Sequence, residues 1–175
     1  HLAEKNILKH WKFIFCNSGT ESVLKSLRIC GAITNKQKIA SVVGSWHGSV
    51  DNTLFSPDKN LKPLKLSDGL SKSSKKNIIF LPYNDIENSK KILDVHKKKL
   101  MCIIIEPVQG CLPLENSKKY LKFLESYCKK NKLILFFDEM ITGLRTEGSS
   151  VQSIYKITPD ISTFGKCFGG GVQIG

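Results

Sequence analysis

The chain has 175 residues, and 41% of them are hydrophobic, which is enough to bury a core as one domain of ordinary size. Lys and Arg number 27 against 15 Asp and Glu, and this formal net charge of +12 raises the question of an acidic partner such as nucleic acid or an anionic membrane. The lysines are spread over residues 59–76, 90–99 and 118–132 without interleaved aromatic residues or finger-like Cys/His spacing, so we favour a solvated basic surface and expect no nucleic-acid partner.

Strands and helices are predicted to alternate along the chain. Short β-branched or aromatic runs predict strands at residues 12–15, 38–43, 77–80, 101–106, 133–137 and 161–164. Segments of helical period predict helices at residues 19–33, 85–95 and 117–130. This alternation is typical of strand-helix-strand units, so we expect a three-layer α/β/α domain with a mostly parallel sheet. Residues 53–76 show no sustained period and predict a long loop.

Cysteine usage and hydropathy bear on the cellular compartment. The six cysteines are widely separated and form no Cys-x-x-Cys pair, which favours a reducing cytoplasm and predicts no metal site. There is no apolar signal core at the N-terminus, and no segment approaches the roughly 18 uninterrupted apolar residues of a membrane span. We therefore expect a cytoplasmic protein without a membrane partner. The chain starts without Met and stops inside a glycine-rich pattern, so we expect a fragment that is incomplete at both ends.

Polar residues follow three of the predicted strands, at the edge where an open parallel sheet binds ligands. After the first strand, Ser18-Gly19-Thr20 opens a helix and offers free N–H groups and hydroxyls to a phosphate, although a plain helix cap is the simpler interpretation. Asp138 follows the fifth strand, where a salt-bridged or capping carboxylate is the alternative. Lys166 follows the sixth strand among glycines, and a lysine is seldom placed in apolar surroundings without a task.

An anion cradle, a carboxylate and a lysine on one edge of one sheet suit a phosphorylated pyridine aldehyde. The phosphate would dock at Ser18-Gly19-Thr20. Asp138 would keep the pyridine nitrogen protonated, and Lys166 would form a Schiff base. The three groups together therefore predict a site for pyridoxal 5'-phosphate (PLP).

Six motifs occur in order along almost the whole chain: Asn17-Ser18-Gly19-Thr20-Glu21, Trp46-His47-Gly48, Pro82-Tyr83-Asn84-Asp85, Glu106-Pro107-Val108-Gln109-Gly110, Phe137-Asp138-Glu139-Met140-Ile141-Thr142-Gly143-Leu144-Arg145, and Pro159-Asp160 with Gly165-Lys166 and Gly169-Gly170-Gly171. Their order and spacing resemble those of class III aminotransferases. Within that family the chain is most similar to the glutamate-1-semialdehyde 2,1-aminomutases. Six ordered motifs are far more specific than any one of them.

The resemblance implies a fold, an assembly and further residue roles. The fold would be the large domain of a PLP-dependent transferase of fold type I over residues 1–175, with a small C-terminal domain absent. The protein would be a homodimer whose partner subunit completes each phosphate site, and the fragment alone would bind PLP weakly. Trp46 would stack on the pyridine ring, with core packing as the alternative, and Met140 would pack on the opposite ring face. His47 would line the site or serve as a structural histidine.

The activity implied by the resemblance is PLP-dependent transfer of an amino group between a small amino donor and a carbonyl acceptor. An aminomutase-like reaction comes first, and a general ω-transaminase is the alternative. Cys111 bears on this choice, because it stands where many ω-amino-acid transaminases place a glutamate and aminomutases tend to an asparagine. A non-catalytic scaffold is disfavoured because Lys166 and Asp138 occur together.

Overall fold

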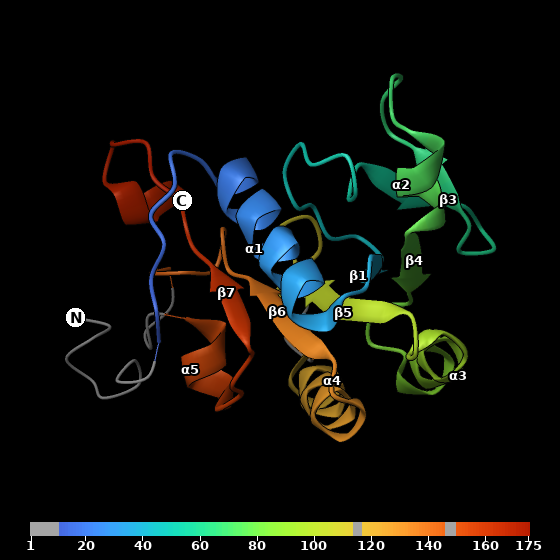
Figure 1. Ribbon diagram of the computed structural model, residues 1–175. Helices are drawn as coiled ribbons and strands as arrows, with labels where there is room; N and C mark the ends of the chain where they lie inside the picture. The colour runs from blue at the N-terminus through green and yellow to red at the C-terminus, as the bar shows by residue number, and fades with distance from the viewer. Residues whose placement is uncertain (1–10, 114–116, 146–149) are drawn as a thin grey trace.

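A five-stranded parallel sheet lies at the centre of the computed structural model, which describes residues 11–113, 117–145 and 150–175 (Figure 1). The strand order is β4-β1-β5-β6-β7, with every neighbouring pair parallel. The chain moves outward from β1 to β4 and then returns to the other side of β1 with β5, so a topological switch point lies between β1 and β5. The strands are β1 (Lys38–Val42), β4 (Ile78–Leu81), β5 (Leu100–Ile105), β6 (Ile134–Asp138) and β7 (Ile161–Thr163).

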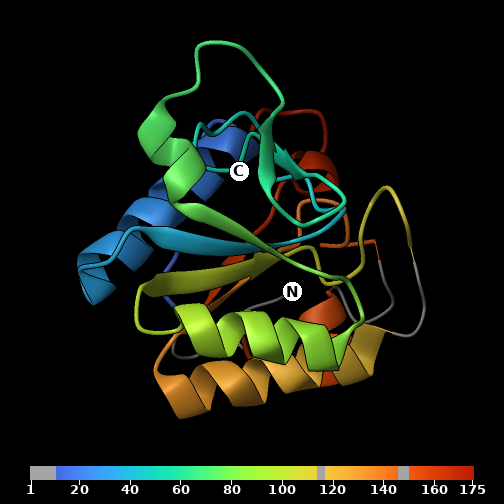
Figure 2. The ribbon, with the colours of Figure 1, turned by 90° about the vertical axis from the view of Figure 1, so that its right-hand side faces the viewer.

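Helices cover both faces of this sheet. Helix α1 (Gly19–Thr34) lies on one face, while α3 (Ile86–His96) and α4 (Lys118–Asn131) lie side by side on the other (Figure 1, Figure 2). Successive side chains of β5 point to opposite faces of the sheet. Cys102 and Ile104 pack in the core that contains α1 residues, whereas Ile103 and Ile105 pack in the core that contains α4 residues. A strand buried on both faces needs a continuous apolar run, which β5 has. The three-layer α/β/α expectation is confirmed.

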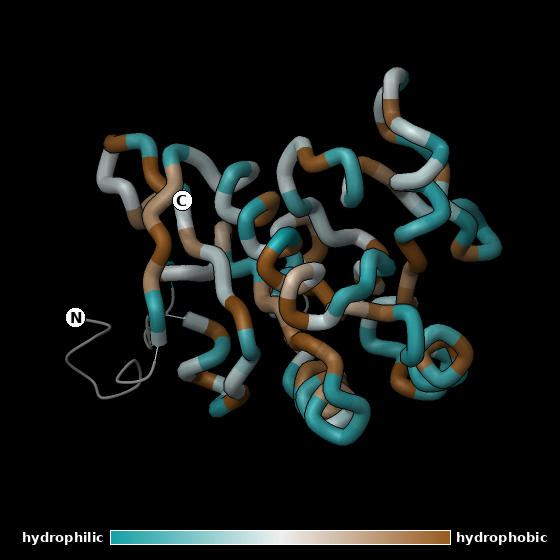
Figure 3. The backbone as a smooth tube through the Cα atoms, in the orientation of Figure 1, coloured by the Kyte–Doolittle hydropathy of each residue, from teal (hydrophilic) through white to brown (hydrophobic). Residues whose placement is uncertain are grey.

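The surface helices carry much of the positive charge. Figure 3 shows hydrophobic positions concentrated in the central strands and hydrophilic positions recurring along α3 and α4. Helix α4 exposes lysines such as Lys119 and Lys122 while Leu121 and Leu124 are buried. Among the residues that the structure describes, no helix is both long and apolar enough to cross a membrane.

Most predicted elements are confirmed with small shifts at their ends, but the strand at residues 12–15 is wrong. This segment has no regular secondary structure, and Phe13 and Phe15 are 61% and 75% exposed. A strand requires a hydrogen-bonded neighbour. Among the described residues, the backbone–backbone hydrogen bonds of residues 12–16 are confined to Cys16, whose N–H and carbonyl each bond Gly175 at 2.8 Å.

The long loop predicted for residues 53–76 is also wrong, because it contains regular structure. Strands β2 (Phe55–Pro57) and β3 (Pro63–Lys65) form an antiparallel hairpin, followed by the short helix α2 (Lys72–Lys76). Elements of three to five residues are too short to show a period in the sequence. The same reason explains why helix α5 (Val151–Tyr155) and the 3₁₀ turn η2 (Lys166–Gly169) were not predicted.

Candidate functional site

The N-terminus of α1 presents unpaired backbone N–H groups. Ser18 is the N-cap residue, and its Oγ accepts a hydrogen bond from the Glu21 N–H at 3.1 Å. Glu21 reaches back to accept the Asn17 N–H at 2.8 Å, and Lys25, which is paired with Glu21 at 2.6 Å, lowers the pKa of that carboxyl. Within the described part of the chain, the N–H groups of Gly19 and Thr20 have no hydrogen-bond acceptor. These two donors and the helix dipole favour an anion at this point.

Asp138 is the last residue of β6, and its side chain is buried in a set of hydrogen bonds. Oδ1 accepts from the Thr163 hydroxyl at 3.1 Å and from the Met140 N–H at 3.2 Å. Oδ2 lies 2.8 Å from Nδ1 of His47, and both side chains are 1% exposed. An ionised carboxylate has about four acceptor positions, so these three partners leave roughly one of them free on Oδ2.

The turn after β1 is hydrogen-bonded to side chains of the Glu106 to Gly110 motif, which follows β5. The carboxylate of Glu106 accepts the Trp46 N–H at 2.7 Å and the Gly110 N–H at 3.1 Å, and burial raises the pKa of Glu106. The amide of Gln109 donates to the Val43 carbonyl at 2.7 Å and to the Ser45 hydroxyl at 3.2 Å. The two sides of the switch point are therefore joined by hydrogen bonds of the Glu106 and Gln109 side chains.

The predicted aromatic residue of the site lies at the surface. The side chain of Trp46 is 52% exposed, so its role is not core packing. His47, the next residue, is 3% exposed and faces inward. The two neighbouring side chains therefore point in different directions: the Trp46 indole is exposed and the His47 imidazole is buried.

Lys166 follows β7 and begins η2. Its side chain is exposed, so the expected apolar surroundings are not provided by the described residues. Its backbone has φ of 51°, in the left-handed region that a non-glycine residue adopts at a cost of roughly 1 kcal/mol. Lys156, which precedes β7, has a similar φ of 53°, so this conformation is not particular to Lys166.

Met140 packs between the α1 terminus and the lysine segment. A Cβ added to Gly19 would lie 2.8 Å from the Met140 sulfur, and one added to Gly165 would lie 2.5 Å from it. Met140 itself is 9% exposed. The two glycines therefore let the anion-binding turn and the lysine segment approach the same side chain.

The structure brings the sequence-predicted residues to one edge of the sheet, where the turn after β1, the end of β6, the segment after β7 and the start of α1 meet. Sequence reasoning missed the contacts made by Glu106, Gln109 and Thr163. Glu106 carried a usable signal, because it follows an apolar strand at the ligand-binding edge as Asp138 does. Thr163 carried none, since only the register of β6 and β7 places it opposite Asp138.

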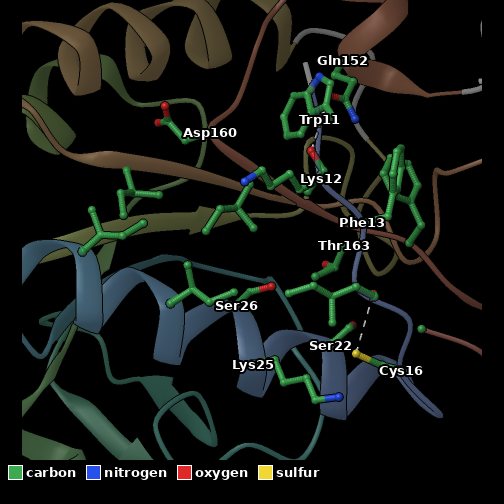
Figure 4. Close-up of a pocket in the computed structure, with 18 of the residues that line it drawn as sticks. Trp11, Lys12, Phe13, Cys16, Ser22, Lys25, Ser26, Gln152, Asp160 and Thr163 are labelled. Carbon is green, nitrogen blue, oxygen red and sulfur yellow. Dashed lines mark hydrogen bonds between the residues drawn. The ribbon is translucent and has the colours of Figure 1, made fainter. Parts of the chain in front are cut away.

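A groove of about 950 Å³ lies beside this edge of the sheet (Figure 4). It runs between the extended residues 11–16, one side of α1 and β7, and its lining includes Phe13, Ser26 and Asp160. None of the eight predicted site residues lines it. Size alone therefore does not identify the candidate site.

The fold and this edge define an α/β protein with a candidate ligand site at the carboxyl ends of the strands of a parallel sheet. Residues 2–175 match the family model described as aminotransferase class-III, so the chain belongs to that family. It is 37% identical over 164 residues to a glutamate-1-semialdehyde 2,1-aminomutase of Methanosphaera stadtmanae, covering 92% of this chain and 38% of that relative.

Two solved structures share the fold at a TM-score of 0.82. They are an ω-transaminase from Sphaerobacter thermophilus, at 30% identity, and a transaminase with PLP bound, at 28% identity. Each comparison covers 91% of this chain and 38% of the solved chain. The expected fold type I architecture is confirmed, and the chain spans about two fifths of the length of the proteins it matches.

Proposed function

We propose that this chain is the PLP-binding part of an enzyme that moves amino groups in the manner of glutamate-1-semialdehyde 2,1-aminomutase. The observation that carries the proposal is the meeting of three chemically different groups at one sheet edge. They are the unpaired N–H groups of Gly19 and Thr20, the Asp138 carboxylate with one acceptor position left, and Lys166. The name and similarity of the Methanosphaera relative support the aminomutase-like assignment.

The residues present fit PLP on their donor and acceptor chemistry. Gly19 and Thr20 offer N–H donors, and the Ser18 and Thr20 hydroxyls can each donate a proton while their oxygens accept bonds from Glu21 and Ser49. A phosphate needs such donors. The free acceptor position on Asp138 Oδ2 suits a protonated pyridine nitrogen.

When bound, the cofactor supplies an electron-accepting ring for charge that develops at the substrate α-carbon. Ser18, Gly19 and Thr20 would bind its phosphate, and Asp138 would hold the proton on the ring nitrogen. Trp46 and Met140 would contact the two ring faces. Lys166 would hold the aldehyde carbon through its amine and, once displaced, would carry a proton to or from the substrate α-carbon.

The properties of the whole protein belong to the same proposal. We infer a cytoplasmic homodimer in which the partner subunit completes each phosphate site. Its reactants would be a small amino donor and a small carbonyl acceptor. An aminomutase would use both groups on one carbon skeleton.

The test uses the full-length protein with PLP, borohydride reduction and peptide mapping. We expect the pyridoxyl group on Lys166 and an absorbance band of the bound cofactor that is lost in Lys166→Ala. Lys156→Ala is the matched control, because Lys156 is an exposed lysine with φ of 53° that precedes β7 at the opposite end of that strand. Labelling of another lysine, or no band at saturating PLP, would refute the assignment.

A general ω-transaminase is the second candidate, and two observations favour keeping it. Cys111, which follows the Glu106 to Gly110 motif, is exposed at the same end of the sheet. The Sphaerobacter ω-transaminase also shares the fold at 30% identity. A screen of amino donors and carbonyl acceptors on the full-length enzyme separates the candidates, since only an aminomutase converts its single substrate without a second one.

A further inference from the structure

Residues 46–49 contact three separate parts of the candidate site in succession. The Trp46 N–H bonds Glu106 after β5, the His47 ring bonds Asp138 at the end of β6, and the Ser49 N–H bonds the Thr20 hydroxyl at 3.2 Å. The segment therefore joins the carboxylate to the anion-binding turn. Neither group contacts the other directly in the hydrogen bonds of the described residues.

The position of His47 is fixed from both sides along the chain. On one side Glu106 holds the Trp46 N–H at 2.7 Å. On the other side Gly48 has φ of 72° and lies so close to Thr20 that an added Cβ would be 2.6 Å from Thr20 Oγ1. A backbone held at both neighbours leaves the imidazole little freedom to leave Asp138.

The hydrogen bond between His47 and Asp138 also defines which ring nitrogen carries a proton. A carboxylate oxygen can only accept, so Nδ1 of His47 is the donor to Oδ2. The other nitrogen, Nε2, is buried and has no partner within the described residues. A buried N–H without an acceptor is costly, so of the two neutral tautomers the hydrogen bonds favour the one with its proton on Nδ1.

We propose that His47 is a positioning residue of the PLP site, which it serves through Asp138. Its Nδ1–H occupies one acceptor position of Oδ2 and, with Thr163 and Met140 on Oδ1, leaves about one position that the ring nitrogen would take. Because residues 46–49 also bond Thr20, the same segment fixes the distance between the nitrogen partner and the phosphate cradle. The inference rests on the proposed PLP site and adds a residue that acts without touching the cofactor.

The first experiment observes His47 directly in the full-length protein without PLP. Nitrogen-15 correlation spectra of histidine-labelled protein, assigned with His47→Asn, give the protonation of each ring nitrogen. A protonated Nδ1 supports the proposal, whether or not Nε2 also carries a proton. A ring protonated on Nε2 alone would overturn it, because Nδ1 could not then donate to Asp138.

The second experiment compares two substitutions that differ in one hydrogen bond. His47→Asn keeps an amide donor near the position of Nδ1, whereas His47→Leu fills the space without a donor. We expect His47→Leu to weaken PLP binding roughly tenfold or more and to lower kcat at saturating PLP, with His47→Asn within about threefold of the wild type. His96→Leu, at the end of α3, is the matched control, and circular dichroism checks that each variant folds.

The outcomes separate this inference from the proposed function. If wild-type protein binds PLP and His47→Leu binds it equally well with unchanged kcat, the positioning role is wrong while the PLP site stands. If His47→Asn is damaged as much as His47→Leu, the shape of the ring matters and the hydrogen bond does not. If wild-type protein binds no PLP, the proposed function fails, and the spectra of His47 still decide whether it donates to Asp138.

Discussion

Gly48 lies against Thr20, with no room for a side chain between the turn after β1 and the first turn of α1. A Cβ on Gly48 would come within 2.6 Å of Thr20 Oγ1 and 3.1 Å of its α-carbon. The second atom belongs to the helix backbone, so a rotamer change of Thr20 cannot relieve the contact. The close approach is therefore built into the two backbones.

We predict that Gly48→Ala costs about 2 to 4 kcal/mol of stability, from left-handed strain of about 1 kcal/mol and overpacking of about 1 to 3 kcal/mol. Gly69→Ala is the matched control, because Gly69 has φ of 84° and nothing within 4 Å of an added Cβ. Urea unfolding of the full-length protein measures both. Equal losses for the two variants would show that the contact with Thr20 costs nothing.

Ser18 has two roles that a pair of substitutions can separate. Its Oγ caps α1, and its hydroxyl proton is proposed to reach a phosphate. Ser18→Ala should lose about 1 kcal/mol of stability with the cap. Ser18→Asp should keep the cap and the stability, yet weaken PLP binding roughly tenfold or more by repelling the phosphate and removing a donor.

The measurements for Ser18 are a urea midpoint and a PLP titration on the same full-length preparations. A stable Ser18→Asp variant that binds PLP as tightly as wild type would place the phosphate elsewhere. The comparison distinguishes a plain helix cap from an anion site, the two interpretations that the sequence left open.

The elements that sequence predicted well are those whose signal is local. The run of apolar residues in β5 and the Ser18 to Glu21 cap of α1 depend on neighbours in the chain, and both are confirmed. Residues 12–15 have the same apolar character as a strand, but a strand also needs a partner. Composition could not show that β7 pairs only with β6 among the described residues.

The candidate site likewise has residues that a local sequence pattern could indicate and contacts that it could not. Ser18, Asp138 and Lys166 could be proposed from the sequence because each follows a predicted strand and carries a conspicuous functional group. The hydrogen bonds around Asp138 were not predictable, since they join residues 25 and 91 positions away, Thr163 and His47. Those contacts depend on which strands are neighbours and on the register between them. A local sequence pattern predicts neither of these.

We predict that the lysine proposed to bind PLP at position 166 lowers the stability of the folded protein relative to a glycine at the same position. Its φ of 51° is unfavourable for a lysine and acceptable for a glycine. Lys166→Gly should therefore be more stable than Lys166→Ala by about 1 kcal/mol in the protein without PLP. Urea unfolding of both variants gives the difference, and Lys156→Gly against Lys156→Ala, at φ of 53°, should show a similar one. A more stable alanine variant at position 166 would argue that this backbone is not strained.

His96 provides a prediction on pH dependence away from the site. Burial, followed by the positive charges of Lys38 and Lys99, lowers the pKa of its imidazole from the ordinary value of 6.5. The unfolded chain then binds more protons than the folded one between the lowered pKa and 6.5, so this group adds stability as pH rises through that window. The stability difference between wild type and His96→Asn should shift in favour of wild type from pH 5 to pH 8.

Two measurements check this on the full-length protein. Urea unfolding across the pH range gives the stability difference, and nuclear magnetic resonance of the His96 ring gives its pKa directly. High salt should move that pKa part of the way back, because it screens the two lysines while leaving the effect of burial. A His96 ring that titrates at or above the ordinary range would contradict the partial burial of His96 beside the charges of Lys38 and Lys99.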